Sequence, residues 1–140
     1  MVPINYLAVL LNVVIAMALG YAWYGPLFGK QWAASVGMSY ADMEAAMKRN
    51  MAFSYGMMAL GALIMSFVLA HSEIFAGTYM QVSGVAAGLQ AGLWNWLGFI
   101  APVLMGGVIW ERKPWAWWCI NAGYYLVLLM IMGVVLALWV

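Results

Sequence analysis

The stretch GYAWYGPLFGKQW, residues 20–32, follows an apolar run without a charge that begins at Ile4. It contains the aromatic residue types that prefer the lipid headgroup region, namely Trp23, Tyr24 and Trp32. Gly25 and Pro26 are residues that interrupt helices, and Lys30 can extend its ammonium group into water. We therefore expect a membrane-crossing helix to end at this point.

The composition of the whole chain supports a membrane protein. Of 140 residues, 69% are hydrophobic and 6% are charged, and the mean hydropathy is +0.97. A soluble domain is about 45 to 50% apolar and about 25% charged. The net charge of +1 offers no basic surface for phosphates, so we expect no nucleic-acid partner.

Four uncharged segments are long enough to cross a bilayer, which takes about 20 helical residues. They are residues 4–24, 51–70, 82–110 and 115–139. No segment alternates between apolar and polar residues as the strands of a membrane barrel do. The sequence therefore predicts an all-α polytopic membrane protein, a four-transmembrane-helix bundle that forms a single domain over residues 1–140.

The third segment contains a proline, Pro102, inside its apolar run. A proline has no backbone N–H, so it would leave the carbonyl group of Gly98 without its helical partner. We expect a kink or a tilt at Gly98 and Pro102.

All five cations lie in the first and third connections between these segments, and they are Lys30, Lys48, Arg49, Arg112 and Lys113. Cytoplasmic loops are enriched in lysine and arginine. The pattern predicts that both connections are cytoplasmic and that both termini lie outside, which is the periplasm if the protein resides in the inner membrane of a Gram-negative bacterium.

The first connection contains SYADMEAAMKRN, residues 39–50. Ser39 can cap a helix in which Asp42 follows three residues later, and Glu44 can pair with Lys48. We predict a short helix over about residues 40–49 that lies on the membrane surface or continues into the second segment.

The third segment carries glycines at four-residue steps, Gly84, Gly88 and Gly92. Small residues at this spacing let two helices approach closely in lipid. They predict either packing inside the bundle or an interface between subunits.

Uncharged polar residues in the segments predict two interior layers, because an amide exposed to lipid is costly. The midplane layer comprises Asn12, Ser66 and Asn95. The layer nearer the cytoplasm comprises Ser54, Tyr55, Asn121 and Tyr124. Each layer either supplies hydrogen bonds between helices or forms a polar pocket for a ligand.

Cations and aromatic residues gather at the inward connections, where they either anchor the topology or contact anionic lipids. The expected lipid contacts are Trp23, Tyr24, Lys30, Trp32, Lys48, Arg49, Trp110, Arg112, Lys113 and Trp115.

Residue types that commonly serve in catalysis are scarce in this chain. The four acidic residues all lie outside the expected segments, with His71 and Glu73 beside the outward connection. One histidine without spaced partners predicts no metal site, and we expect no cofactor. Cys119 stands alone in an apolar stretch and is expected in the core. An enzyme that acts on lipid through Glu111 is the least favoured hypothesis.

Three stretches resemble a bacterial membrane family known as domain of unknown function 1761. They are ALGYAWYGPLFGKQW (18–32), WLGFIAP (96–102) and INAGYYL (120–126), and the resemblance covers nearly the whole chain. It implies four transmembrane helices and brings no established activity, substrate or site residues.

The sequence thus predicts a non-catalytic membrane protein, a homo-oligomer that binds membrane lipids, a hydrophobic small molecule or a partner membrane protein. The alternative, which the interior asparagines suggest, is a small oligomeric transporter or channel.

Overall fold

The computed structural model describes residues 4–49 and 51–139, and every regular element in that part of the chain is a helix. Four continuous helical segments are long and apolar enough to cross a membrane, as in an integral membrane protein. They span Tyr6–Leu27, Ala52–Met80, Gly84–Ile109 and Trp115–Leu138.

Two of these segments change helix type along their length. The elements in chain order are α1 (Tyr6–Ala22), the π-helical turn η1 (Trp23–Leu27), α2 (Gly29–Ser35), α3 (Tyr40–Met47), α4 (Ala52–Met80), α5 (Gly84–Asn95), the π-helical turn η2 (Trp96–Ile100), α6 (Ala101–Ile109) and α7 (Trp115–Leu138).

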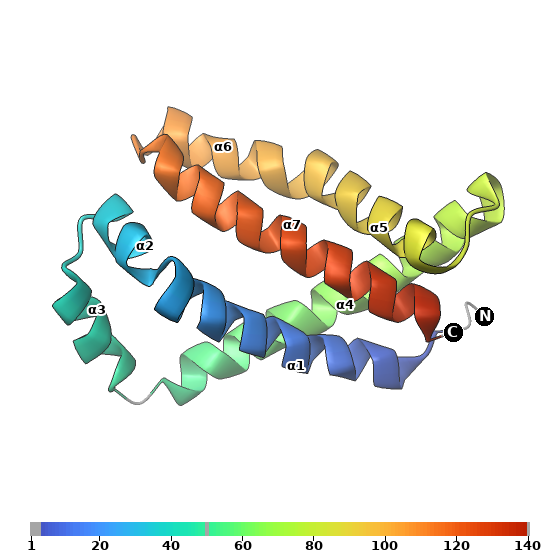
Figure 1. Ribbon diagram of the computed structural model, residues 1–140, viewed down its shortest axis with the longest axis horizontal. Coiled ribbons are helices and arrows are strands. Elements are labelled where there is room, and N and C mark those ends of the chain that lie inside the picture. The colour runs from blue at the N-terminus through green and yellow to red at the C-terminus, as the bar shows by residue number, and fades with distance from the viewer. Residues whose placement is uncertain (1–3, 50, 140) are drawn as a thin grey trace.

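The long helices run side by side, and α7 packs against α1, α4 and α5 (Figure 1). The helices α2 and α3 and the connection between α6 and α7 lie at one end of the bundle, here termed the cationic end because it holds all five cations. The start of α1, the connection between α4 and α5 and the end of α7 lie at the opposite end, here termed the terminal end. The ends of the helices therefore alternate as four antiparallel crossings require.

Glycines decide how α5 meets α7. A Cβ atom added to Gly88 would overlap the backbone of Gly133, and one added to Gly92 would lie 2.5 Å from the carbonyl oxygen of Leu129. Gly84 meets nothing within 4 Å and begins α5 with a φ of +63°. Gly88 and Gly92 therefore pack the bundle itself, which leaves them unavailable as an interface between subunits.

The first span ends one residue after Pro26, within the stretch where an end was expected, and it passes through Gly25 and Pro26 without a break. Its helical path continues to Leu27 through η1, where the N–H of Phe28 donates to the carbonyl of Trp23 at 2.8 Å. A π-helical turn changes the pairing of the backbone, so the missing N–H of a proline is tolerated. The third segment also contains a π-helical turn near its proline. Gly98 lies in η2, and Pro102 lies in the first turn of α6.

The second long helix extends ten residues beyond the expected end at Ala70, since α4 continues to Met80. The residues after His71 are mostly apolar and contain no proline, so the helix ends only at Gln81, whose φ is +53°. As a consequence Glu73 lies within the helix.

The short helix of the first connection, α3, is capped by the Ser39 hydroxyl and ends before α4 begins, so the two helices are separate.

Candidate functional site

A fully buried hydrogen bond joins α1 to α4 near the middle of the bundle. The side-chain Nδ2 of Asn12 donates to Ser66 Oγ at 2.9 Å and to the carbonyl oxygen of Met132 in α7 at 3.2 Å. Asn12 and Ser66 are both 0% exposed. This pair links α1, α4 and α7 through hydrogen bonds.

Asn95 does not share that layer. Its Nδ2 donates to Ser72 Oγ at 2.9 Å and to the carbonyl oxygen of Ala91 at 2.8 Å. Ser72 lies in the part of α4 beyond the expected end of the second segment. The expected end at residue 70 left Ser72 outside the second segment, so this partner of Asn95 was not predicted.

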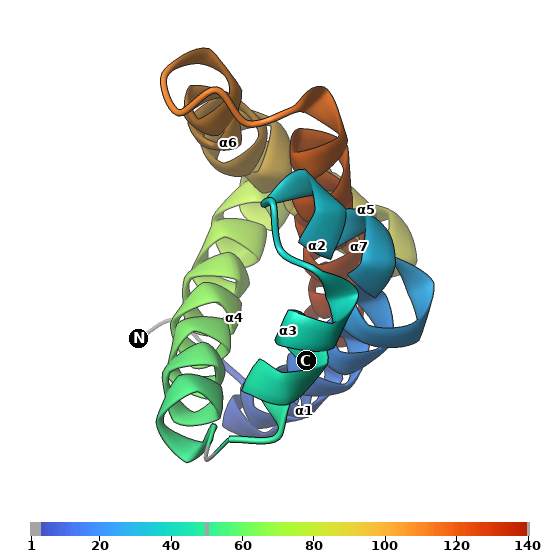
Figure 2. The same ribbon diagram turned by 90° about the vertical axis from the view of Figure 1, so that its left-hand side faces the viewer.

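The layer nearer the cationic end contains only part of the expected set. The Tyr24 hydroxyl donates to Asn121 Oδ1 at 2.8 Å, and the Tyr124 hydroxyl donates to the carbonyl oxygen of Ala16 at 3.1 Å. Ser54 and Tyr55 are exposed on α4 instead. The start of α4 stands away from the other long helices, so its polar residues do not reach this layer (Figure 2).

Each π-helical turn contains a tryptophan whose indole N–H donates a hydrogen bond to α7. Trp23 Nε1 donates to the carbonyl oxygen of Ile120 at 3.0 Å, and Trp96 Nε1 donates to that of Ala122 at 2.7 Å. Trp23 therefore faces the bundle and not the headgroups. The shared pattern of tryptophan, one residue and glycine at 23–25 and 96–98 was the signal in the sequence for this common role.

Two apolar grooves flank α4. The α1-side groove has a volume of about 350 Å³ and is lined by Ala16, Met17, Met57, Met58, Gly61, Ala62, Met65, Tyr124, Tyr125 and Leu128. The α5-side groove has a volume of about 340 Å³ and is lined by Ile64, Met65, Val68, Leu69, Asn95, Phe99, Ile100 and Leu129. Methionine side chains are flexible and polarisable, so they adapt to ligands of varied shape.

The basic residues of the cationic end differ in their contacts. Lys113 pairs with Glu111 at 2.7 Å and lies over the ring of Trp117 at 4.3 Å, and Lys30 lies 5.6 Å from the centre of the Tyr40 ring. The remaining three cations are exposed, and they are Lys48, Arg49 and Arg112.

Aromatic residues at this end divide into two groups. Trp110 and Trp115 are 84% and 57% exposed, whereas Trp32 packs edge-on against the ring of Tyr24. Cys119, expected in the core, is exposed on α7.

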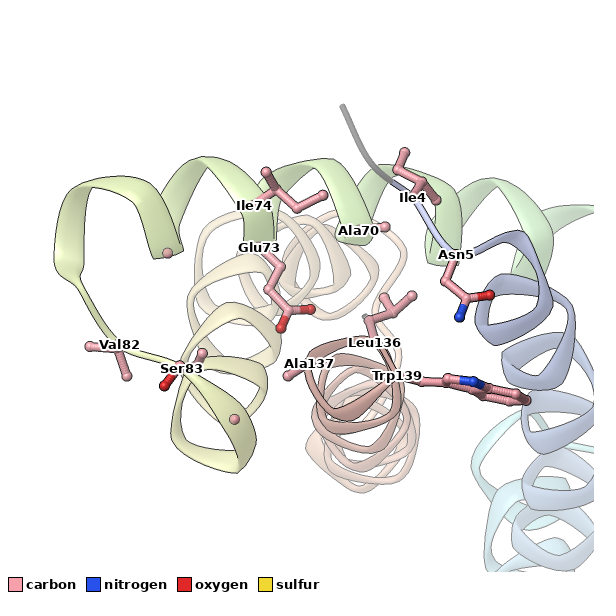
Figure 3. Close-up of a pocket in the computed structure, with 13 residues that line it drawn as sticks. Ile4, Asn5, Ala70, Glu73, Ile74, Val82, Ser83, Leu136, Ala137 and Trp139 are labelled. Atoms are coloured by element: carbon pink, nitrogen blue, oxygen red, sulfur yellow. The ribbon is translucent and has the colours of Figure 1, made fainter. Parts of the chain in front are cut away.

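Within residues 4–49 and 51–139, no three His, Cys, Asp or Glu side chains lie close enough together to hold a metal ion. A carboxyl group nevertheless enters the bundle at the terminal end, because α4 places Glu73 between α5 and α7 (Figure 3). Its side chain borders a cavity of about 180 Å³. Glu73 was expected in a connection, so this cavity was not predicted from the sequence.

A family model described as a protein of unknown function (DUF1761) matches residues 7–137. The chain belongs to this family. The resemblance seen in three stretches of the sequence is thereby confirmed. No curated protein and no solved structure matches the chain.

Proposed function

We propose that this DUF1761 protein is a non-catalytic integral membrane protein that binds an anionic phospholipid. An acyl chain of the lipid lies in the α1-side groove, and its headgroup meets the cations that precede α4. The observation that carries the proposal is the groove itself, a space of about 350 Å³ with methionines along one wall.

The position of the groove suits a lipid. Met57 and Met58 line it and lie about 8 Å along α4 from Ala52, at a helical rise of about 1.5 Å per residue. Lys48 and Arg49 precede α4 and are exposed. A headgroup phosphate held by these cations would therefore lie beyond the start of α4, on the side toward which the groove extends.

The charge distribution supports an orientation with the cationic end in the cytoplasm. The exposed ring of Trp110 supports an interfacial position for this end. A bacterial cytoplasmic membrane, which is rich in anionic lipid, fits this arrangement.

The alternative function, an oligomeric transporter or channel, requires a polar path across the bilayer. The buried, hydrogen-bonded pair of Asn12 and Ser66 argues against such a path between α1 and α4 of one chain. For this reason lipid binding is the favoured proposal.

Lipid retention by the purified protein tests the proposal. The protein is incorporated into nanodiscs that contain equal amounts of phosphatidylglycerol and phosphatidylcholine and is analysed by native mass spectrometry. The wild type is expected to retain phosphatidylglycerol. Lys48→Gln with Arg49→Gln should reduce this preference about tenfold or more, since each basic residue near a membrane contributes about 1 kcal/mol.

Two glycines of α4 provide a matched pair for the groove. A Cβ atom would meet nothing within 4 Å at Gly56 or at Gly61, but only Gly61 lines the groove. Gly61→Leu is expected to displace the lipid and Gly56→Leu to leave it bound. Equal retention by the two variants, or a bound partner protein in place of lipid, would contradict the proposal.

A further inference from the structure

Glu73 is a carboxyl group buried inside the bundle. It lies on the last third of α4, is 9% exposed, and points toward the space between α5 and α7 (Figure 3). Its Oε2 atom is buried and has no hydrogen-bond partner among the described residues. Ionisable residues within membrane-spanning helices are rare and costly, so one that faces an internal cavity indicates a binding role.

Among the described residues, no cationic side chain lines the cavity beside this carboxyl group. The residues that line the cavity include no lysine, arginine or histidine, and all five lysines and arginines lie at the cationic end. His71 is close in sequence, but its Nδ1 lies 2.9 Å from the carbonyl oxygen of Phe67 and its ring stacks on Phe67. A ligand that supplies a positive charge would therefore pair with an ionised Glu73.

The cavity determines what kind of cation fits. Its volume of about 180 Å³ slightly exceeds that of a cavity of about 150 Å³ that holds benzene. Apolar side chains form most of the wall, among them Ile4, Ile74 and Leu136, and Trp139 contributes an aromatic ring. An organic cation with a compact apolar body matches both the charge and the wall.

The side chains that line this cavity offer few ligands for a metal ion. The Asn5 side-chain oxygen already accepts hydrogen bonds from the backbone N–H groups of Leu7 and Ala8. Calcium needs six to eight oxygen ligands, and transition metals need several nitrogen, sulfur or oxygen ligands. One carboxylate with the Ser83 hydroxyl across the cavity does not provide such a set.

We propose that this cavity binds a small organic ammonium ion, which enters at the terminal end and pairs its charge with the carboxylate of Glu73. The site lies at the end of the bundle opposite the cations assigned to lipid headgroups. The ammonium site can therefore be tested independently of the proposed lipid site.

Fluorine NMR with a small aromatic amine tests the site. The full chain is placed in nanodiscs of zwitterionic lipid, and the line broadening of 4-fluorobenzylammonium is measured against nanodiscs without protein. Binding to wild type is expected to be saturable. Glu73→Gln keeps the shape of the side chain and removes its charge, so it should weaken binding at least about tenfold.

Two controls separate charge from shape. The exposed Glu44 of α3 lies at the cationic end, so Glu44→Gln should bind the amine as wild type does. The neutral compound 4-fluorobenzyl alcohol should bind wild type and Glu73→Gln equally weakly. Amine binding that is absent from wild type, or unchanged in Glu73→Gln, would overturn the proposal.

A second variant keeps the test decisive if Glu73→Gln fails to fold, as judged by circular dichroism and size-exclusion chromatography. Ala137 lines the cavity from α7, and Ala137→Leu would fill part of the space while it keeps the carboxylate. It should weaken amine binding as well. Undiminished binding by a folded Ala137→Leu would place the amine elsewhere and refute the site.

Discussion

Glycine serves opposite purposes in two regions of this bundle. Where α5 crosses α7, Gly88 and Gly133 bring two backbones into direct contact, and neither position has room for a Cβ atom. Along the first half of α4, Gly56 and Gly61 have open space around them. The same residue type therefore closes one interface and keeps another open.

This difference explains where the molecule can hold a ligand. In lipid no hydrophobic force pulls helices together, so close packing of small residues determines which helices associate tightly. The seam of α5 and α7 has that packing. The first half of α4 lacks it, and Phe53, Met57 and Met58 are 81%, 52% and 48% exposed there. The two larger grooves consequently form along α4, away from the close contact of Gly88 with Gly133.

The largest expected effect comes from breaking the seam. Gly133→Ala would place a methyl group against the backbone of Gly88, where only a shift of a whole helix could relieve the overlap. Overpacking of this kind typically costs 1 to 3 kcal/mol, and we expect a value of about 3 kcal/mol because backbone atoms are involved. The free energy of unfolding, measured by SDS titration in mixed micelles, checks this. A loss of under about 1 kcal/mol would show that the seam is not tightly packed.

A moderate effect is expected from the bond that holds α4 to the bundle. Ser66→Ala removes the acceptor of the Asn12 amide and leaves the bond to Met132 intact. Hydrogen bonds between membrane helices contribute about 0.6 kcal/mol on average and about 1.7 kcal/mol at most. The same titration should give a loss in this range, and the cavity beside α4 should widen. Additive losses in Asn12→Ala, Ser66→Ala and their double variant would show that the two side chains do not interact.

The smallest effect is expected in the open region. Gly56→Ala adds a methyl group that meets nothing within 4 Å, and alanine favours a helix over glycine by up to about 1 kcal/mol. Stability should therefore stay the same or rise by no more than about 1 kcal/mol. A clear loss would mean that the first half of α4 packs against something that the isolated chain lacks, such as a second copy.

The sequence was sufficient for the large features of the fold. Runs of about 20 uncharged residues predicted four crossing helices, and the structure has four helices of that kind. The step of four between Gly88 and Gly92 predicted a packing face, although only the structure shows that α7 occupies it.

The misses have a common physical cause. Hydropathy places a helix end where the first charge appears, but a long helix can bury one carboxyl group on its inner face, as α4 does with Glu73. The apolar residues Ile74, Phe75 and Ala76 after Glu73 were the available signal. Likewise, the π-helical turn at Gly25 and Pro26 was not predicted, because its backbone pairing depends on tertiary contacts such as the hydrogen bond of the Trp23 indole.

The central claim is that the chain crosses a bilayer four times with its cations at one face. The most direct test uses Cys119→Ser with one new cysteine, either Ser39→Cys at the cationic end or Ser83→Cys at the terminal end, expressed in a bacterial host. A membrane-impermeant maleimide should label Ser83→Cys in intact cells and Ser39→Cys only after the membrane is opened. Labelling of both variants from the same side would contradict the account.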